Sequence, residues 1–258
     1  QQGWLDKAVM LRLIKPGGHL SNDDVFNIPG LPTNSFISND TKVGYYGNSQ
    51  GSVLGGGYFA SSIDLTHAVL GVPGCPFSLL LSRSKDFGPY HAAFQMQIYN
   101  QRDLRISMSV LEQLWDVSES GGWLNVIRDN NWSGYPHKNV LMQAALGDAQ
   151  VPTVAGEFMG RTYRTNTIKP QTRPVFGMIE KVPPFEDGNG YVEFKYDDVP
   201  VAPIIDIPPT DGKDTHECPR RERRGQDQIH DFFILNKIVQ HCNGICESKT
   251  CPKGDSRN

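Results

Sequence analysis

The sequence has no long apolar run and no large excess of charge of either sign. None of its apolar stretches approaches the length that crosses a bilayer, so we expect no transmembrane helix. The net charge is -3, which gives no basic surplus for a nucleic-acid partner and favours a small-molecule partner. At 258 residues the chain can bury one substantial core, and we expect a single globular region over 1–258 rather than two domains.

Cysteine is scarce outside the C-terminal tail. Cys75 stands alone, whereas Cys218, Cys242, Cys246 and Cys251 fall in the last fifth of the chain. Crowded cysteines in a loop-rich tail favour disulfides and an oxidising compartment, which predicts a secreted, periplasmic or cell-surface protein. The pairing does not follow from the sequence, although Cys218 could pair with Cys242 or Cys246.

Zinc binding is the competing interpretation of this tail. Cys242, Cys246 and Cys251 lie near His241, yet the paired short spacings of structural zinc sites are absent. Disulfides are therefore the favoured prediction.

The remaining patterns alternate between strands and helices. Short β-branched and aromatic runs that end at glycine predict buried strands, and longer periodic apolar runs predict helices. The predicted strands are 43–46, 68–74 and 139–148, and the predicted helices are 4–14, 52–63, 104–117, 151–163 and 223–239. This order is typical of an α/β fold with flanking helices.

Three regions depart from that alternation. The stretch 77–137 is rich in Leu, Met and aromatic residues and contains one clear helical pattern, so we expect an inserted helical cap. The stretch 169–213 holds many prolines and the hairpin-like YVEFKYDDVPVAPIIDI, which predicts an extended excursion between core elements. Residues 240–258 form the cysteine-rich tail.

The most informative motif is GNSQG, which places Ser49 between a predicted strand and a predicted helix. In that context Gly47 and Gly51 permit a turn so tight that the serine hydroxyl stands exposed above the sheet. The N-terminus of the following helix stabilises negative charge, and the Gln50 N–H would be one oxyanion donor. A bare G-x-S-x-G is common by chance, but this context makes Ser49 the favoured nucleophile.

A serine hydroxyl also needs a base and an acid that orients the base. Asp148 ends the third predicted strand, at the carboxyl edge where such sheets place functional groups; the alternative is a loop residue that caps the next helix. His216 follows in a polar loop before the last helix and is the expected base, with His230 as the weaker alternative. Asp86 and Asp116 are weaker candidates for the orienting acid, because both lie in the predicted cap.

These residues and their surroundings resemble a known family, the large, exported bacterial lipase-like hydrolases of the α/β-hydrolase superfamily. The similar segments lie between residue 2 and about residue 224 and are QGWLDKAVMLRLIK, YYGNSQGSVLGGGYFA, AVLGVPGCPFSLLLSRSKDFGPY, LEQLWDVSESGGW, HKNVLMQAALGDAQVPTVAGEFMGRTY and DTHECPRR. By this resemblance Ser49 is the nucleophile, Asp148 the acid and His216 the base, on an α/β-hydrolase sheet with flanking helices and an inserted cap.

The resemblance leaves one part of the fold unaccounted for. Members of the family carry a long region before the position of Gln2, and it supplies the first strands of the sheet and the second oxyanion donor. Few residues precede Ser49 here, and QQGWLDKAVMLRLIK lacks the layout of a signal peptide. We therefore expect a C-terminal part of a longer polypeptide, with N-terminal strands on a companion segment or chain. Strand 43–46 would otherwise expose an unpaired edge.

The sequence thus predicts a serine hydrolase that cleaves small-molecule or lipid carboxylic esters through an acyl-enzyme, with no metal or organic cofactor. The expected substrate contacts are Asn48, Phe77, Leu80, Phe87 and Trp115, and further candidates for an apolar acyl pocket are Leu79, Tyr90, Phe94, Met96, Met108 and Leu111. Ordinary packing within the cap is the alternative for each of these side chains. The alternative functions are an acyltransferase or peptidase with the same three residues, and a non-catalytic hydrolase-like binding module.

Overall fold

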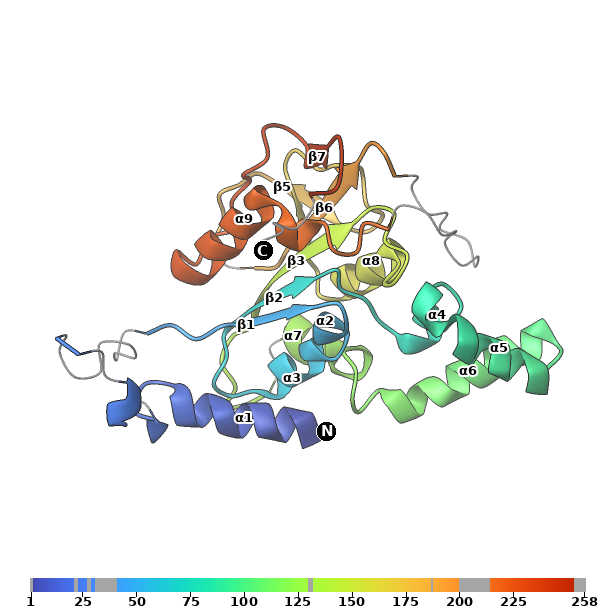
Figure 1. The fold of residues 1–258 in the computed structure, drawn as a ribbon, viewed down its shortest axis with the longest axis horizontal. Helices are drawn as coiled ribbons and strands as arrows, with labels where there is room; N and C mark the ends of the chain where they lie inside the picture. Colours follow the sequence, from blue (N-terminus) through green and yellow to red (C-terminus); the bar gives the residue numbers. More distant parts are fainter. Residues whose placement is uncertain are drawn as a thin grey trace.

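The sheet is built from the short β-branched and aromatic runs of the sequence. In the computed structural model, which describes residues 2–20, 23–26, 29–30, 41–129, 132–186, 188–199 and 214–252, seven strands form one mostly parallel sheet. The strands are β1 (Tyr45–Asn48), β2 (His67–Gly71), β3 (Asn139–Ala145), β4 (Asn166–Ile168), β5 (Ile179–Lys181), β6 (Gly190–Tyr196) and β7 (Glu247–Ser248). Their order is β1-β2-β3-β6-β4-β5, with β7 beside β6, and helices flank the sheet as in other α/β folds (Figure 1).

The described chain also contains α-helices before, between and after these strands. They are α1 (Gln2–Ile14), α2 (Gln50–Val53), α3 (Gly55–Ser61), α4 (Phe77–Leu81), α5 (Gly88–Gln97), α6 (Gln101–Trp115), α7 (Leu124–Asp129), α8 (Thr153–Thr162) and α9 (Arg223–Ile234). Short 3-10 helices are η2 (Asp24–Phe26), η3 (Lys85–Phe87), η4 (Gly121–Trp123) and η5 (Pro219–Arg221). Within the described ranges, no helix is both long enough and apolar enough to cross a bilayer.

Alternate strand positions divide the core into two layers. On β3, Val140 and Met142 belong to the layer that α3, α7 and α8 cover, whereas Leu141 between them belongs to the layer that α9 covers. Every residue of β3 is buried, as expected for a central parallel strand with helices on both faces. The carboxyl ends of β1, β2 and β3 are therefore held in a well-packed frame.

The three predicted strands are present with shifted ends, but the expected burial is wrong for the first of them, because β1 is an edge strand with only Gly47 buried. The structure places them at Tyr45–Asn48, His67–Gly71 and Asn139–Ala145. Parallel pairing sets these ends, since β1 pairs with β2 from Tyr45 to Asn48 and β2 pairs with β3 from His67 to Gly71.

The predicted helix 52–63 is two helices, α2 and α3, joined at Leu54. The glycines that follow Leu54 lower helix propensity, and they also permit close packing. A Cβ on Gly57 would lie 2.3 Å from the Trp4 ring, and a Cβ on Gly56 would lie 2.4 Å from the Ser120 hydroxyl. These glycines bring α3 against α1 and the loop before η4, not only against the sheet.

The proline-rich region 169–213 contributes to the sheet itself. Instead of one arm of a hairpin outside the core, Gly190–Tyr196 forms β6, which pairs in parallel with β3 and with β4. The reason is its alternating apolar pattern, which buries Val192 and Phe194 in the α9 layer and Tyr191 in the opposite one. Residues 200–213, the second part of the expected hairpin, lie outside the described residues.

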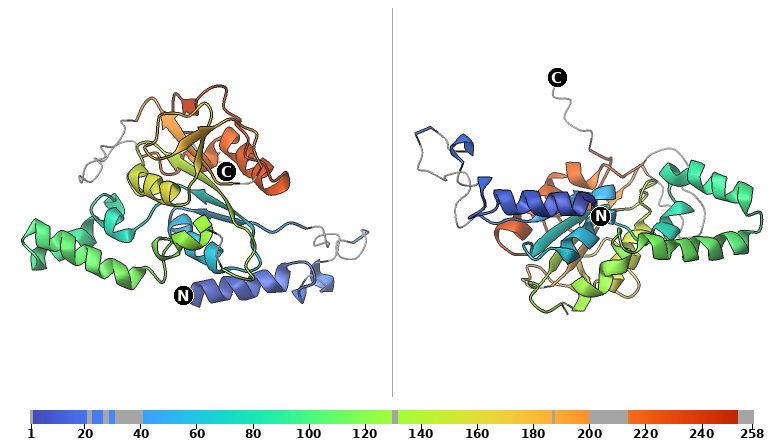
Figure 2. Two further views of the ribbon diagram at one scale, coloured as in Figure 1. Left: turned by 180° about the vertical axis from the view of Figure 1, so that it is seen from behind. Right: turned by 90° about the horizontal axis from the view of Figure 1, so that it is seen from below.

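The region 77–137 is helical over most of its described length, from α4 to α7. Leu81, Leu104 and Met108 form a small buried cluster of their own, against which Phe94 and Trp115 pack. Figure 2 shows α5 and α6 extending away from the sheet, while α7 lies against it. The helix predicted at 104–117 begins earlier, because the Asn100 side chain accepts hydrogen bonds from Arg102 N–H and Asp103 N–H at its N-terminus.

The cysteine tail contains two disulfides, Cys218–Cys251 and Cys242–Cys246. The pairing suggested for Cys218 from the sequence is therefore wrong, and the structure joins it to a cysteine nearer the C-terminus. With all four thiols in disulfides, no thiolate remains here for the zinc interpretation. Two disulfides indicate an oxidising, extracytoplasmic environment, and Cys75 is a buried free thiol.

Candidate active site

Ser49 stands in a strained turn between β1 and α2. Its φ of 59° and ψ of -126° lie outside the regions that L-residues ordinarily adopt. The turn is so tight that a Cβ on Gly47 would lie 2.1 Å from the Gly51 carbonyl oxygen. Ser49 N–H donates to the Gly71 carbonyl at 3.0 Å, which ties the turn to the end of β2. The hydroxyl is therefore held at the carboxyl edge of the sheet by backbone geometry.

His216 bridges Ser49 and Asp148. Its Nε2 lies 2.7 Å from Ser49 Oγ, and its Nδ1 lies 2.9 Å from Asp148 Oδ2 and 3.0 Å from Oδ1. The side chains come from three distant parts of the chain and form one hydrogen-bonded series. The structure thus brings together the three residues that the sequence analysis selected.

The Asp148 carboxyl is almost fully buried, with 1% of its side chain exposed. Burial raises its pKa above the ordinary value, and the hydrogen bond to His216 and the backbone N–H groups of Val151 and Gln150 oppose that rise. Both N–H groups donate to Oδ1 at 2.8 Å. This arrangement fixes the direction in which the carboxyl faces the imidazole.

Asp214 holds the loop that carries His216, and the sequence analysis assigned it no role. One carboxyl oxygen accepts from His216 N–H at 3.1 Å and from Ala149 N–H at 3.0 Å. The other lies 2.6 Å from Lys85 Nζ in η3. Burial would raise the pKa of Asp214, but its hydrogen bonds, led by that from Lys85, hold the pKa below its ordinary value. An aspartate two residues before a histidine is the available sequence signal, because short acidic side chains often accept such a backbone N–H.

A cavity of about 290 Å³ opens beside Ser49. Of the expected substrate contacts, Phe77, Leu80 and Phe87 line it, and so does Gln50, the expected oxyanion residue. Gln50 is the first residue of α2, so the helix itself does not use its N–H. Sequence reasoning missed the further lining residues, which are Val53, Asp86, Gln150 and Val151. Asp86, the weaker candidate for the acid, lines this cavity, whereas the carboxyl that contacts the His216 ring belongs to Asp148.

Two of the expected substrate contacts lie elsewhere. Trp115 is not among the described residues that line the cavity; its ring packs edge-on against Phe77 with centroids 5.9 Å apart. Asn48 Oδ1 points toward β2, where a Cβ on Gly71 would lie 2.5 Å from it. Of the further candidates, Tyr90 and Met96 are 63% and 64% exposed, and Leu79 and Met108 line a different cavity.

Two glutamates of the helical region 77–137 fix the start of α4, whose side chains line the Ser49 cavity. Glu119 accepts from Phe77 N–H at 3.1 Å, and Glu112 accepts from Ser78 N–H at 2.7 Å. The remaining Oε1 atoms of both glutamates are buried without a donor. Burial and the adjacent Glu112 raise the pKa of Glu119 well above its ordinary value. The raised pKa favours a proton on Glu119, which its carboxyl can donate to Glu112.

These two glutamates and Asp116 form a carboxylate cluster whose ligand atoms all lie within 4.8 Å of one another. It is the group among the described residues whose spacing would suit a metal ion. Glu112 and Glu119 already accept backbone hydrogen bonds there, so their position has a structural explanation. The cluster also removes Asp116 from consideration as the partner of His216.

The alternative base, His230, lies on α9 away from Ser49. Its Nδ1 is 3.1 Å from Asp231 Oδ1, and 65% of its side chain is exposed. His241 contacts the same aspartate at 2.8 Å. Neither histidine forms part of the series that contains Ser49.

No protein-family model, curated protein or solved structure matches this chain. A hydroxyl within hydrogen-bond distance of an imidazole, which a buried carboxyl orients, can lose its proton to that imidazole as it attacks an electrophilic carbon.

Proposed function

We propose that the protein is a serine hydrolase that cleaves carboxylic esters. The observation that carries this proposal is His216, which lies 2.7 Å from Ser49 Oγ on one side and 2.9 Å from Asp148 on the other. The strained backbone at Ser49, between a parallel strand and a helix, supports an α/β-hydrolase type of fold. The two disulfides support a secreted, periplasmic or cell-surface location.

The proposed reaction has two halves. Ser49 Oγ attacks the ester carbonyl carbon while His216 Nε2 takes the hydroxyl proton, and the Gln50 N–H stabilises the oxyanion. As the bond to the alcohol oxygen breaks, His216 returns the proton to that oxygen, which leaves an acyl group on Ser49. Water then attacks the acyl carbon, gives a proton to His216 and releases the acid, and His216 returns the proton to Ser49.

The Ser49 cavity favours an ester with a compact apolar group. A volume of about 290 Å³ lies at the lower end of ligand pockets, and Phe77, Leu80 and Phe87 supply apolar surface. Asp86 and Gln150 add polar groups to the same wall, and they would contact a hydroxyl or amine of the substrate. A small-molecule or short-chain lipid ester fits these dimensions.

We also propose that a further strand from a companion segment pairs with β1. Among the described residues β1 pairs with β2 alone, and it is the first strand in the sheet order. Such an edge presents unpaired N–H and C=O groups that another strand can satisfy. The companion would also supply a second oxyanion donor beside Gln50. Intact mass and N-terminal sequence of natively purified protein test this, because an active monomer of this chain alone would refute it.

Hydrolysis of matched substrates tests the proposed reaction. We expect p-nitrophenyl butyrate to be cleaved and the corresponding p-nitroanilide to be cleaved far more slowly, with both activities lost in Ser49→Ala. Equal cleavage of the anilide would favour the peptidase alternative, and preferred transfer of the acyl group to an added alcohol would favour an acyltransferase. A correctly folded wild-type protein that cleaves neither substrate would favour the non-catalytic module.

A further inference from the structure

The cavity beside Ser49 carries one negative charge. Of the described residues that line this cavity of about 290 Å³, Asp86 alone has a side chain of formal charge. The rest of the described wall consists of a hydroxyl, two amides and apolar side chains. A cavity with one sign of charge and apolar walls concentrates the electric field, so it favours a ligand of the opposite charge.

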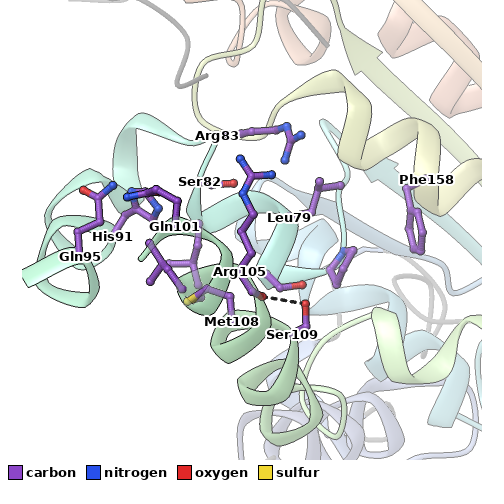
Figure 3. Close-up of a pocket in the computed structure, with 14 residues that line it drawn as sticks. Leu79, Ser82, Arg83, His91, Gln95, Gln101, Arg105, Met108, Ser109 and Phe158 are labelled. Carbon is purple, nitrogen blue, oxygen red and sulfur yellow. Dashed lines mark hydrogen bonds between the residues drawn. The ribbon is translucent and has the colours of Figure 1, made fainter. Parts of the chain in front are cut away.

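The Asp86 carboxyl is free to bind such a ligand. Within the described part of the chain it accepts no hydrogen bond and forms no ion pair, and the partner of Asp86 is the Ser84 hydroxyl, which accepts from the backbone N–H. Lys85 Nζ lies 2.6 Å from Asp214. Arg83 lines a second cavity, of about 590 Å³ (Figure 3). Neither of these neighbouring cations is paired with Asp86.

Gln150 supplies a second acceptor in the same cavity. Its Nε2 donates to Asp214 Oδ2 at 2.9 Å, and a carboxylate oxygen can only accept, so this contact fixes which way the amide faces. The Gln150 Oε1 accepts no hydrogen bond from the residues that the structure describes. A protonated amine has N–H donors and a positive charge, so it matches both a free carboxylate and a free carbonyl oxygen.

The aromatic side chains of the wall also suit an organic cation. Phe77 and Phe87 both line the cavity, with ring centroids 5.8 Å apart. An alkylated ammonium group combines apolar carbon surface with positive charge, and it is attracted to the face of an aromatic ring. A metal ion would need several oxygen ligands, whereas Asp86 is the one carboxylate of the described wall.

We propose that the ester substrate carries a cationic amine, which Asp86 binds while Ser49 attacks the carbonyl carbon. The attack rests on the proposed function, whereas the binding of the cation rests on the cavity alone. The cation can belong to the alcohol half or to the acyl half of the ester, because both halves extend from the carbon that Ser49 attacks.

Calorimetric titration of the Ser49→Ala protein tests the binding without turnover. Butyrylcholine has its charge in the alcohol half, and the methyl ester of γ-trimethylammoniobutyrate has it in the acyl half. Each is compared with a neutral isostere, in which a tert-butyl group replaces the trimethylammonium group. We expect the cation of one pair to bind at least about tenfold more tightly than its isostere, because the carboxylate and the ring faces both favour the charge. The pair that shows this difference identifies the half that carries the cation.

A variant of Asp86 in the Ser49→Ala background locates the cation. Asp86→Asn keeps the size of the side chain but removes its charge, so the preference for the cation should fall to about twofold or less. Asp103→Asn is the matched control, since Asp103 is an exposed aspartate of α6 outside the cavity, and it should keep the full preference.

The proposal is overturned if neither cation binds more tightly than its isostere, or if Asp86→Asn keeps the full preference. The proposed function fails separately, because hydrolysis of p-nitrophenyl butyrate involves no cation and the titration involves no hydrolysis.

Discussion

At the scale of single residues, the proposed chemistry depends on how His216 is held. Its two ring nitrogens have different partners, Ser49 and Asp148, which fixes the proton on Nδ1 and leaves Nε2 as an acceptor for the Ser49 hydroxyl. Asp214 accepts the His216 backbone N–H and so places the loop, without touching the imidazole. Orientation of the ring and position of the loop are thus separate tasks of two aspartates.

Replacement of the acid separates its chemical role from packing. Asp148→Asn should retain the fold and lower kcat by about 10³-fold or more, because an amide presents the wrong hydrogen-bonding group to Nδ1. The measurement is ester hydrolysis at saturating substrate, with circular dichroism to verify folding. Asp231→Asn is the matched control, since it alters another Asp–His pair, at His241, away from Ser49. Wild-type turnover in Asp148→Asn would assign the acid role to another residue.

At the scale of elements, the sequence predicted what depends on local pattern. The strand and helix on either side of Ser49 could be recognised from the apolar run, the glycines and their order, and Asp148 from its place after a buried strand. The role of β6 could not be recognised, because its alternating pattern suits a hairpin as well as a sheet strand and only packing against β3 decides between them. The positions of Asn48 and Trp115 depend on side-chain packing in the same way.

We expect Glu119, in the helical region 77–137, to make the stability of the fold depend on pH. Above the ordinary pKa of a glutamate the unfolded chain ionises this group while the folded chain keeps its proton, so stability falls as pH rises until the folded pKa is reached. Glu119→Gln mimics the protonated form. We expect urea unfolding midpoints to fall less between pH 6 and pH 9 in this variant than in the wild type.

The control for this experiment is Glu186→Gln, which alters an exposed glutamate paired with Lys237. It should show the wild-type dependence on pH. An identical pH dependence in Glu119→Gln and the wild type would show that Glu119 is ionised in the folded protein. Comparison between variants is needed because other groups titrate in the same range.

At the scale of the whole molecule, α1 leaves apolar side chains exposed on the β1 side of the sheet. In Figure 1, α1 lies at the bottom of the view, on the β1 side of the sheet. The left view of Figure 2 shows the same arrangement from behind. Leu5, Val9 and Met10 of α1 are 58%, 51% and 53% exposed. Clustered apolar exposure beside a sheet edge is typical of a surface that another segment covers.

We therefore expect this chain to self-associate when it is produced alone. Light scattering after size-exclusion chromatography should show oligomers that increase with concentration, and Val9→Lys should reduce them because it places a charge on the exposed face of α1. Lys7→Ala is the control on the same helix. It removes a charge instead of adding one, so it should not reduce the oligomers. A wild-type chain that stays monomeric at all concentrations would contradict the proposal that another segment covers this surface.

The proposed function requires Ser49 to be a nucleophile that His216 activates. The most direct measurement is intact-mass analysis of the protein after reaction with a fluorophosphonate, followed by peptide mapping of the adduct. We predict one adduct per chain, located on Ser49, absent from Ser49→Ala and formed much more slowly in His216→Ala. A folded wild-type protein that forms no adduct, or forms it on another residue, would contradict the account.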